Sequence, residues 1–127
     1  MSELVKSAGI RTNYIGNRDL KSELRCCIIS NVRANIPQWK RDLSLAPLWK
    51  DVDLVKRGII NYEEFRRRYI ENVLSKKNPE EVYKQYEGWY LLCCEKDDEF
   101  CHRRILAEWL RDAGFDVKEG LFFKRSD

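Results

Sequence analysis

The sequence predicts an α/β fold: a small three-layer domain with a short, mainly parallel sheet flanked by helices. Two apolar runs, residues 25–32 and 89–94, have the near-continuous hydrophobicity of strands that are buried on both faces. An amphipathic helical pattern and a third strand, residues 115–118, follow the second run. A strand, a helix and a strand in this order form a βαβ unit, whose two strands are parallel.

The first elements expected along the chain are a strand at residues 11–15, which Gly16 ends, and a short helix from Asp19. The run at 25–32 comes next, and its β-branched residues favour a strand over a helix. Residues 36–53 contain two prolines and two tryptophans and predict an ordered loop with a short helix. A connection of this length in a small domain is often functional.

Two helix starts follow the loop. Asn61 with Glu64 three residues later is a capping box, and an apolar stripe continues from it. Asn78 precedes Pro79 at the first helical position, where proline is favoured. Both patterns predict helices between the two buried strands.

The last predicted helix follows Glu95. Asp97 or Asp98 is its expected N-cap, and Gly114 ends it. Its buried face is predicted to consist of Ile105, Leu106, Trp109, Leu110 and Ala113. The strand at 115–118 then completes the βαβ unit.

Size and composition fit one domain over residues 1–127, because 43% of the 127 residues are hydrophobic and 35% are charged. A net charge of +3 is too small to predict nucleic-acid binding, and it does not exclude it. No run approaches the length of a membrane span, and the N-terminus lacks a signal peptide's apolar core. We therefore expect a cytoplasmic protein with no membrane partner.

Five cysteines predict reduced thiols rather than disulfides in a cytosolic protein. The adjacent pairs lie inside apolar runs and resemble buried small hydrophobes. Soft ligands for zinc are present in Cys93, Cys94, Cys101 and His102, but no Cys-x-x-Cys knuckle exists. No metal site is predicted, no cofactor is assigned, and a thiol redox or zinc protein remains the third alternative.

Polar residues follow two of the predicted strands. Arg33 comes after the first buried run and Glu95 after the second, and Cys101, His102 and Arg103 open the next helix. The carboxyl ends of parallel strands meet at one edge of a sheet, where ligands usually bind. We expect these five residues to converge there.

Two of these residues are candidate anion binders. A positive side chain in the first turn of a helix opposes the helix dipole, so Arg103 predicts an anionic partner. That partner is either Glu95 or Asp98, in an internal salt bridge, or a ligand phosphate or carboxylate. Arg33 has the same two interpretations and leans towards the ligand because it follows a strand end.

The candidate catalytic residues are Glu95, His102 and Cys101. The ordinary pKa of histidine suits general acid–base catalysis at neutral pH, and a hydrogen-bonded structural histidine is the alternative for His102. A thiol near a helix N-terminus can act as a nucleophile, and packing is the alternative for Cys101.

The chain resembles the prokaryotic and phage family known as domain of unknown function 488. Residues 28–33 with Pro37, and residues 91–95 followed by Cys101-His102-Arg103, carry the resemblance, which spans about residues 13–118. It implies the site positions Arg33, Cys93, Glu95, Cys101, His102 and Arg103. The chain departs from the pattern at Asn31, where longer members have Asp, and at Asp98, where many have Pro.

The first functional hypothesis is a polar site at the carboxyl edge of the sheet. Arg33 and Arg103 would bind a small anionic ligand, a nucleotide or a nucleic-acid component, and the candidate catalytic residues would modify it. The alternative is a non-catalytic binding or inhibitory module, for example phage-encoded, that contacts a protein partner through residues 36–50. Whether the protein is an enzyme stays open at this level.

Overall fold

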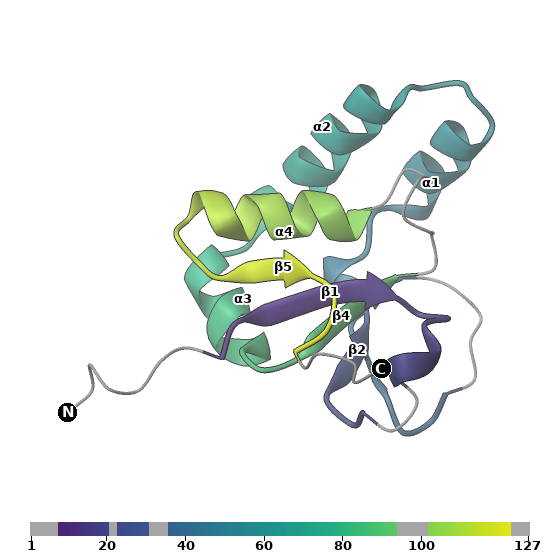
Figure 1. Cartoon of the computed structure of the whole chain (residues 1–127). Coiled ribbons are helices and arrows are strands. Elements are labelled where there is room, and N and C mark those ends of the chain that lie inside the picture. The colour runs from purple at the N-terminus through teal and green to yellow at the C-terminus, as the bar shows by residue number, and fades with distance from the viewer. Residues whose placement is uncertain (1–7, 21–22, 31–35, 94–101, 123–127) are drawn as a thin grey trace.

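The five strands form one parallel sheet in the computed structural model, which describes residues 8–20, 23–30, 36–93 and 102–122 (Figure 1). The strand order is β3-β2-β4-β1-β5. The strands are β1 (Ile10–Tyr14), β2 (Cys26–Ile28), β3 (Lys40–Arg41), β4 (Tyr90–Cys93) and β5 (Val117–Glu119). The predicted α/β fold class is thus confirmed, and β3, inside the predicted loop, is an additional edge strand.

In the described part of the chain, four α-helices and three short 3-10 helices connect the strands. The α-helices are α1 (Trp49–Lys56), α2 (Tyr62–Asn72), α3 (Pro79–Tyr86) and α4 (His102–Asp112). The 3-10 helices are η2 (Arg18–Leu20), η3 (Leu43–Leu45) and η4 (Leu74–Lys76). Because β1 pairs with both β4 and β5, the unit β4-α4-β5 crosses over β1.

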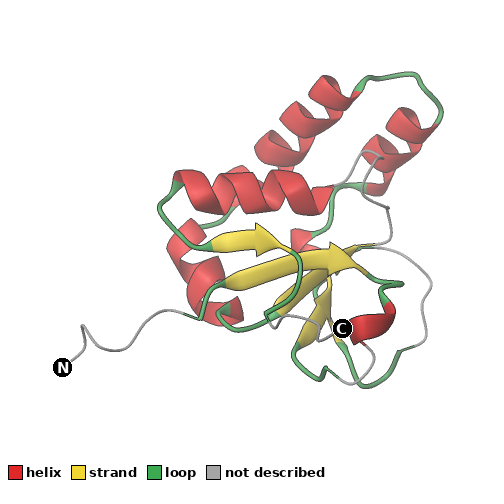
Figure 2. Cartoon of the chain, viewed as in Figure 1, coloured by secondary structure: helices red, strands yellow, loops and turns green. Residues whose placement is uncertain are grey.

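The two faces of the sheet have different covers. Alternate residues of a strand point to opposite faces, so Cys27 packs under the α-helices while Cys26 faces the other way. On the second face η2 and the loop residues 36–39 and 121–122 replace α-helices as the cover. Figure 2 shows the helices on one side of the sheet and the short coil of η2 on the other.

Three of the predicted helix ends are confirmed. The Asn61 side chain accepts a hydrogen bond from the Glu64 amide at 2.8 Å, and Asn78 accepts one from the Glu80 amide at 2.9 Å. Gly114 follows the end of α4 with a φ of +96°, a left-handed conformation that glycine adopts without strain. Local sequence chemistry therefore fixes where these three helices begin or end.

The three consecutive arginines of α2 point in different directions, as their spacing predicts. Arg66 pairs with Glu108 of α4, and Arg67 pairs with Glu64 and Glu71 along its own helix. Arg68 also bonds Glu64, and it reaches the buried Asp51 of α1 at 3.0 Å. The arginines thus connect α2 to its neighbours as well as covering a helix surface.

Within the described residues, no helix combines the length and the apolar character that crossing a membrane requires.

Candidate functional site

The strand order creates a topological switch point between β1 and β4. These neighbouring strands are parallel. The connection after β1 leads to η2 on one face of the sheet, whereas the connection after β4 leads to α4 on the other face. In open α/β sheets, ligands bind where two adjacent strands send their connections in opposite directions. The backbone amide of Ile15 donates to the carbonyl of Cys93 at 2.9 Å, so the two strand ends are directly joined.

A buried polar cluster lies beneath the first turn of α4, and we name it the buried cluster: Thr12, Cys93, Arg103 and Glu119. Arg103 is fully buried, with 0% of its surface exposed. Its Nε donates to both carboxylate oxygens of Glu119 at 3.1 Å, and its Nη2 donates to Oε2 at 2.9 Å. A buried guanidinium needs such a partner, because an unpaired buried charge is strongly destabilising.

Two further contacts complete the buried cluster. Nη1 of Arg103 lies 3.0 Å from Sγ of Cys93, as a donor to the sulfur. The hydroxyl of Thr12 donates to Oε1 of Glu119 at 2.6 Å. Four elements, namely β1, β4, β5 and α4, therefore supply one connected polar network at the carboxyl ends of three neighbouring strands.

His102 precedes Arg103 and points elsewhere. Its Nε2 lies 2.5 Å from the carbonyl oxygen of Ile29, directly after β2, and its ring meets the edge of Tyr69 at a centroid distance of 5.6 Å. A carbonyl oxygen can only accept, so Nε2 carries a proton. The contact ties the start of α4 to the end of β2, in agreement with the structural alternative considered for His102.

The structure places two of the five predicted site residues. His102 and Arg103 both lie in the first turn of α4, buried and directed towards different strands. The other three, Arg33, Glu95 and Cys101, lie outside the described residues, as do the expected caps Asp97 and Asp98. The catalytic and binding roles of all five stay predictions.

Thr12 and Glu119 belong to the site, although no sequence motif indicates them. Glu119 lies 16 positions after Arg103, and Thr12 lies 107 positions before Glu119, so no local spacing connects them. The only signal was a negatively charged residue directly after the predicted strand 115–118, at the edge where the site was expected.

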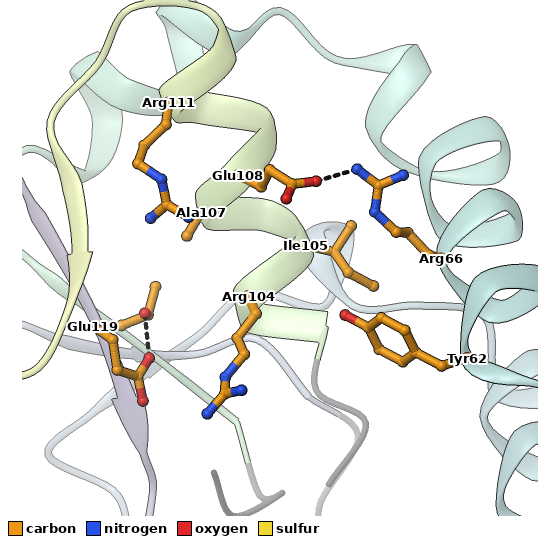
Figure 3. Close-up of a pocket in the computed structure, with 9 residues that line it drawn as sticks. Tyr62, Arg66, Arg104, Ile105, Ala107, Glu108, Arg111 and Glu119 are labelled. Atoms are coloured by element: carbon orange, nitrogen blue, oxygen red, sulfur yellow. Dashed lines mark hydrogen bonds and ion pairs between the residues drawn. The ribbon is translucent and has the colours of Figure 1, made fainter. Parts of the chain in front are cut away.

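The buried cluster adjoins a surface hollow of about 420 Å³, here called the arginine hollow. Thr12 forms part of its wall. So does Glu119, which Figure 3 shows. The remaining lining residues are Tyr62, Arg66, Arg104, Ile105, Ala107, Glu108 and Arg111. Arg66 is paired with Glu108, and Arg111 donates to the carbonyl of Val117 at 2.9 Å. The carboxylate of Glu119 therefore stands between the buried guanidinium and a surface rich in arginine.

The two thiols of β2 are chemically inert at neutral pH. Burial raises the pKa of Cys26 to about 12 and that of Cys27 to about 11, so both remain protonated. They and Cys93 are free thiols in the buried interior. Cys26 and Cys27 therefore act as small hydrophobic residues, as the sequence indicated.

The described residues contain no group of three or more His, Cys, Asp or Glu side chains that could hold a metal ion. Two of the four soft ligands considered for zinc, Cys94 and Cys101, lie outside these residues. The other two have partners: Sγ of Cys93 accepts from Arg103, and Nε2 of His102 is bonded to Ile29.

Fold and site together define a class: a small parallel α/β protein with a charged, buried network at the switch point of its sheet. Comparison of the sequence with protein families is more specific. The model of the family DUF488-N3a, described as the active DUF488-N3 subclade, matches residues 8–114. The chain therefore belongs to the DUF488 family, as its motifs predict. No curated protein and no solved structure matches the chain.

Proposed function

We propose that this protein binds a small anionic ligand, a nucleotide or a nucleic-acid component, at the carboxyl edge of its sheet. Arg33 and Arg103 are the cations of this site, and direct binding requires Arg103 to exchange its partner Glu119 for the ligand anion. Modification of the ligand is part of the proposal, with Glu95 or His102 as acid–base groups and Cys101 as the candidate nucleophile. The cytoplasm is the proposed location.

The observation that carries this proposal is the burial of Arg103 at the strand ends. Removing a guanidinium from water costs several kcal/mol, and a hydrophobic residue of similar volume usually serves stability as well or better. A charge kept in such a place is therefore a functional candidate, particularly at the switch point of a parallel sheet. The description of the matching family as an active subclade further supports chemistry at this site.

Ligand-induced stabilisation tests the binding step. Nucleoside monophosphates, ribose 5-phosphate and inorganic phosphate are titrated while Tm is measured. A ligand at 100 times its Kd should add about 2.7 kcal/mol to the free energy of unfolding and raise Tm accordingly. Arg33→Ala should remove this response, whereas the surface variant Arg67→Ala should keep it. The proposal fails if none of these anions changes Tm at millimolar concentration.

Product analysis tests the chemical step. The ligand that raises Tm is incubated with the protein and examined by mass spectrometry. Glu95→Gln, His102→Gln and Cys101→Ser should each reduce turnover, and at least one of them should retain ligand binding. If the ligand is unchanged after long incubation at high protein concentration, the proposed modification is wrong and only the proposed binding stands.

A specific observation also favours the second candidate, a protein-binding module. In the segment 36–50, Trp49 is 62% exposed, and Leu43 and Leu48 are exposed beside it in the sequence. Contiguous exposed apolar side chains are typical of protein interfaces, and Leu48 and Trp49 are neighbours in the chain. Trp39, in contrast, is buried and belongs to the core of the second face. Only the later part of the segment is therefore suited to contact a partner.

This candidate is tested by replacing Trp49 and Leu48 together with lysine. The double variant should lose co-purification with a protein partner from the native host while its response to anions stays intact. Tyr62→Lys, at another exposed aromatic residue, is the control. If partner recovery is the same for all three proteins, residues 48 and 49 are not the contact surface.

A further inference from the structure

A second hollow, of about 430 Å³, lies on the face of the sheet that carries no α-helix. We name it the tryptophan hollow. The apolar side chains Ile15, Ile36 and Trp39 and the polar side chains Asn17, Arg18 and Gln38 line it. Mostly apolar walls with a few polar groups, in a volume of this size, are typical of small-molecule sites.

The tryptophan hollow adjoins the switch point. Ile15 lines it, and the amide of the same residue bonds the carbonyl of Cys93. Sγ of Cys93 contacts Arg103 on the opposite face of the sheet. The hollow and the buried cluster therefore flank the same pair of strand ends, one on each face.

The aromatic wall of the hollow is held in place. The indole N–H of Trp39 donates to the carbonyl of Glu23 at 2.7 Å, and its ring packs in the cluster that contains Tyr90 and Leu92. Ile15 and Ile36 are partly buried and pack against the same cluster. A rigid apolar wall that contains an indole and two aliphatic side chains suits a planar ring.

Two polar side chains at this hollow remain available to a ligand. In the part of the chain that the structure describes, neither Arg18 nor Gln38 makes a side-chain hydrogen bond or ion pair. Asn17, in contrast, is engaged: its amide donates to Asn13 at 3.0 Å and accepts from the amide of Asp19 at 2.9 Å. The Gln38 amide offers both donors and an acceptor, as the edge of a nucleobase requires. Arg18 adds a positive charge for a neighbouring phosphate.

From this arrangement we propose that the tryptophan hollow binds the base of the nucleotide whose phosphate is held at the switch point. The inference rests on the proposed function and adds to it the ligand class, a nucleoside phosphate instead of a sugar phosphate or free phosphate. Ile15, Ile36 and the accessible part of Trp39 form the apolar wall against which the base packs, Gln38 contacts the edge of the base, and Arg18 supplies positive charge for the phosphate.

The test separates base from phosphate. Adenosine, guanosine, cytidine and uridine, their 5′-monophosphates and ribose 5-phosphate are titrated, with tryptophan fluorescence and Tm as readouts. At least one nucleotide should bind about tenfold more tightly than ribose 5-phosphate, because stacking adds affinity that the sugar phosphate lacks. The nucleoside with the same base should quench tryptophan fluorescence.

Substitutions at the hollow assign this preference. Gln38→Ala and Ile36→Ser should each weaken nucleotide binding by about five- to tenfold while binding of ribose 5-phosphate stays unchanged. Gln85→Ala, at an exposed glutamine of α3, is the matched control and should bind like the original protein. Trp39 is left unchanged because it belongs to the core.

Each outcome decides between the two proposals. If ribose 5-phosphate binds as tightly as every nucleotide, the base subsite is wrong and the anion site stands. The same holds if the Gln38 and Ile36 variants weaken both ligands equally. If Arg33→Ala leaves phosphate-dependent binding intact while the hollow variants abolish nucleoside binding, the base subsite stands and the proposed anion site is wrong. If no nucleoside, nucleotide or sugar phosphate binds, both fail.

Discussion

The buried cluster and the arginines of α2 use the same two side-chain types with opposite consequences. Arg103 is fully buried where it meets the partly exposed Glu119, whereas Arg67 meets Glu64 at the surface of a helix. A surface pair is screened by water and contributes little to stability. In a buried pair, the attraction between the charges must offset the cost of desolvating them. Removing one partner therefore leaves the other charge buried without compensation and strongly lowers the free energy of unfolding. The two ion pairs have similar contact distances, so their different expected contributions to stability come from the burial of Arg103.

The largest effect is expected for Glu119→Ala. This change leaves the Arg103 guanidinium buried without its carboxylate and should lower the free energy of unfolding by about 2–4 kcal/mol. This loss of stability is smaller than for a fully buried pair, because Glu119 is 37% exposed and water can reach Arg103 once the Glu119 side chain is removed. Urea denaturation measures the loss.

Glu108→Ala is the matched control for this prediction, because its partner Arg66 is exposed on the surface. It should cost less than about 1 kcal/mol. Equal losses for the two variants would show that burial of Arg103 has no energetic consequence, and the comparison between the two regions would fail.

The double variant Arg103→Met, Glu119→Leu should recover most of the stability that Glu119→Ala loses. Both charges are then replaced by apolar groups of similar size, and such replacements are often neutral. We expect a free energy of unfolding within about 1 kcal/mol of the original value. Ligand-induced stabilisation should be lost, which separates function from folding. A double variant as unstable as the single one would mean that the pair itself stabilises the fold.

Substitution of Thr12 should destabilise the protein less than Glu119→Ala does. Thr12→Val keeps the shape of the side chain and removes the hydroxyl that donates to Glu119 at 2.6 Å. The free energy of unfolding should fall by about 1.5–2 kcal/mol, the low end of the range for a hydrogen bond to a charged group, because Glu119 is partly exposed. Chemical denaturation at pH 7 measures the change. A stability equal to that of the original protein would show that solvent replaces this bond at no cost.

The smallest effect on stability is expected at Glu64. Hydrogen bonds from Arg67 and then Arg68 lower its pKa to about 2. A lowered folded-state pKa stabilises the protein above the ordinary glutamate pKa, about 4.3, and this contribution disappears as the pH falls towards 2. Because the group is at the surface, Glu64→Gln should not change the urea midpoint at pH 7 measurably.

NMR titration checks the Glu64 pKa directly. Added salt should move it back towards 4.3, as should the double change Arg67→Ala, Arg68→Ala. An unshifted titration in the original protein would show that these surface ion pairs do not persist in solution.

The parts of the fold that local chemistry determines could be predicted from the sequence. Asn61 and Asn78 identify their helix starts because an N-cap satisfies amides two or three residues away. The parallel sheet followed from the buried runs around Cys27 and Leu91 and from the βαβ order. β3 was missed because two exposed residues, Lys40 and Arg41, form it and carry no hydrophobic signal.

The candidate site was predicted only in part, because its contacts connect distant segments. The expected partners of Arg103 in an internal salt bridge were Glu95 and Asp98, nearby in the sequence. Among the described residues, the carboxylate that Arg103 contacts is Glu119, which reaches it through the pairing of β5 with β1. The register of two strands joined by a crossover cannot be derived from one sequence. The pairing of Arg103 with Glu119 could therefore not be predicted either.

The position of β1 in the sheet has a consequence for biosynthesis. β1 leaves the ribosome before the other described strands and pairs with β4 and β5, which are synthesised some 80 and 107 residues later, as the pairs Arg11 with Tyr90 and Thr12 with Glu119 show. Contacts between such distant segments form slowly, because long stretches of chain must be closed first. β1 therefore emerges before either of its partners and can join the sheet only after β4 or β5 has been synthesised. The carboxylate that neutralises Arg103 arrives last, so a nascent chain halted before β5 would contain the guanidinium without its counter-charge.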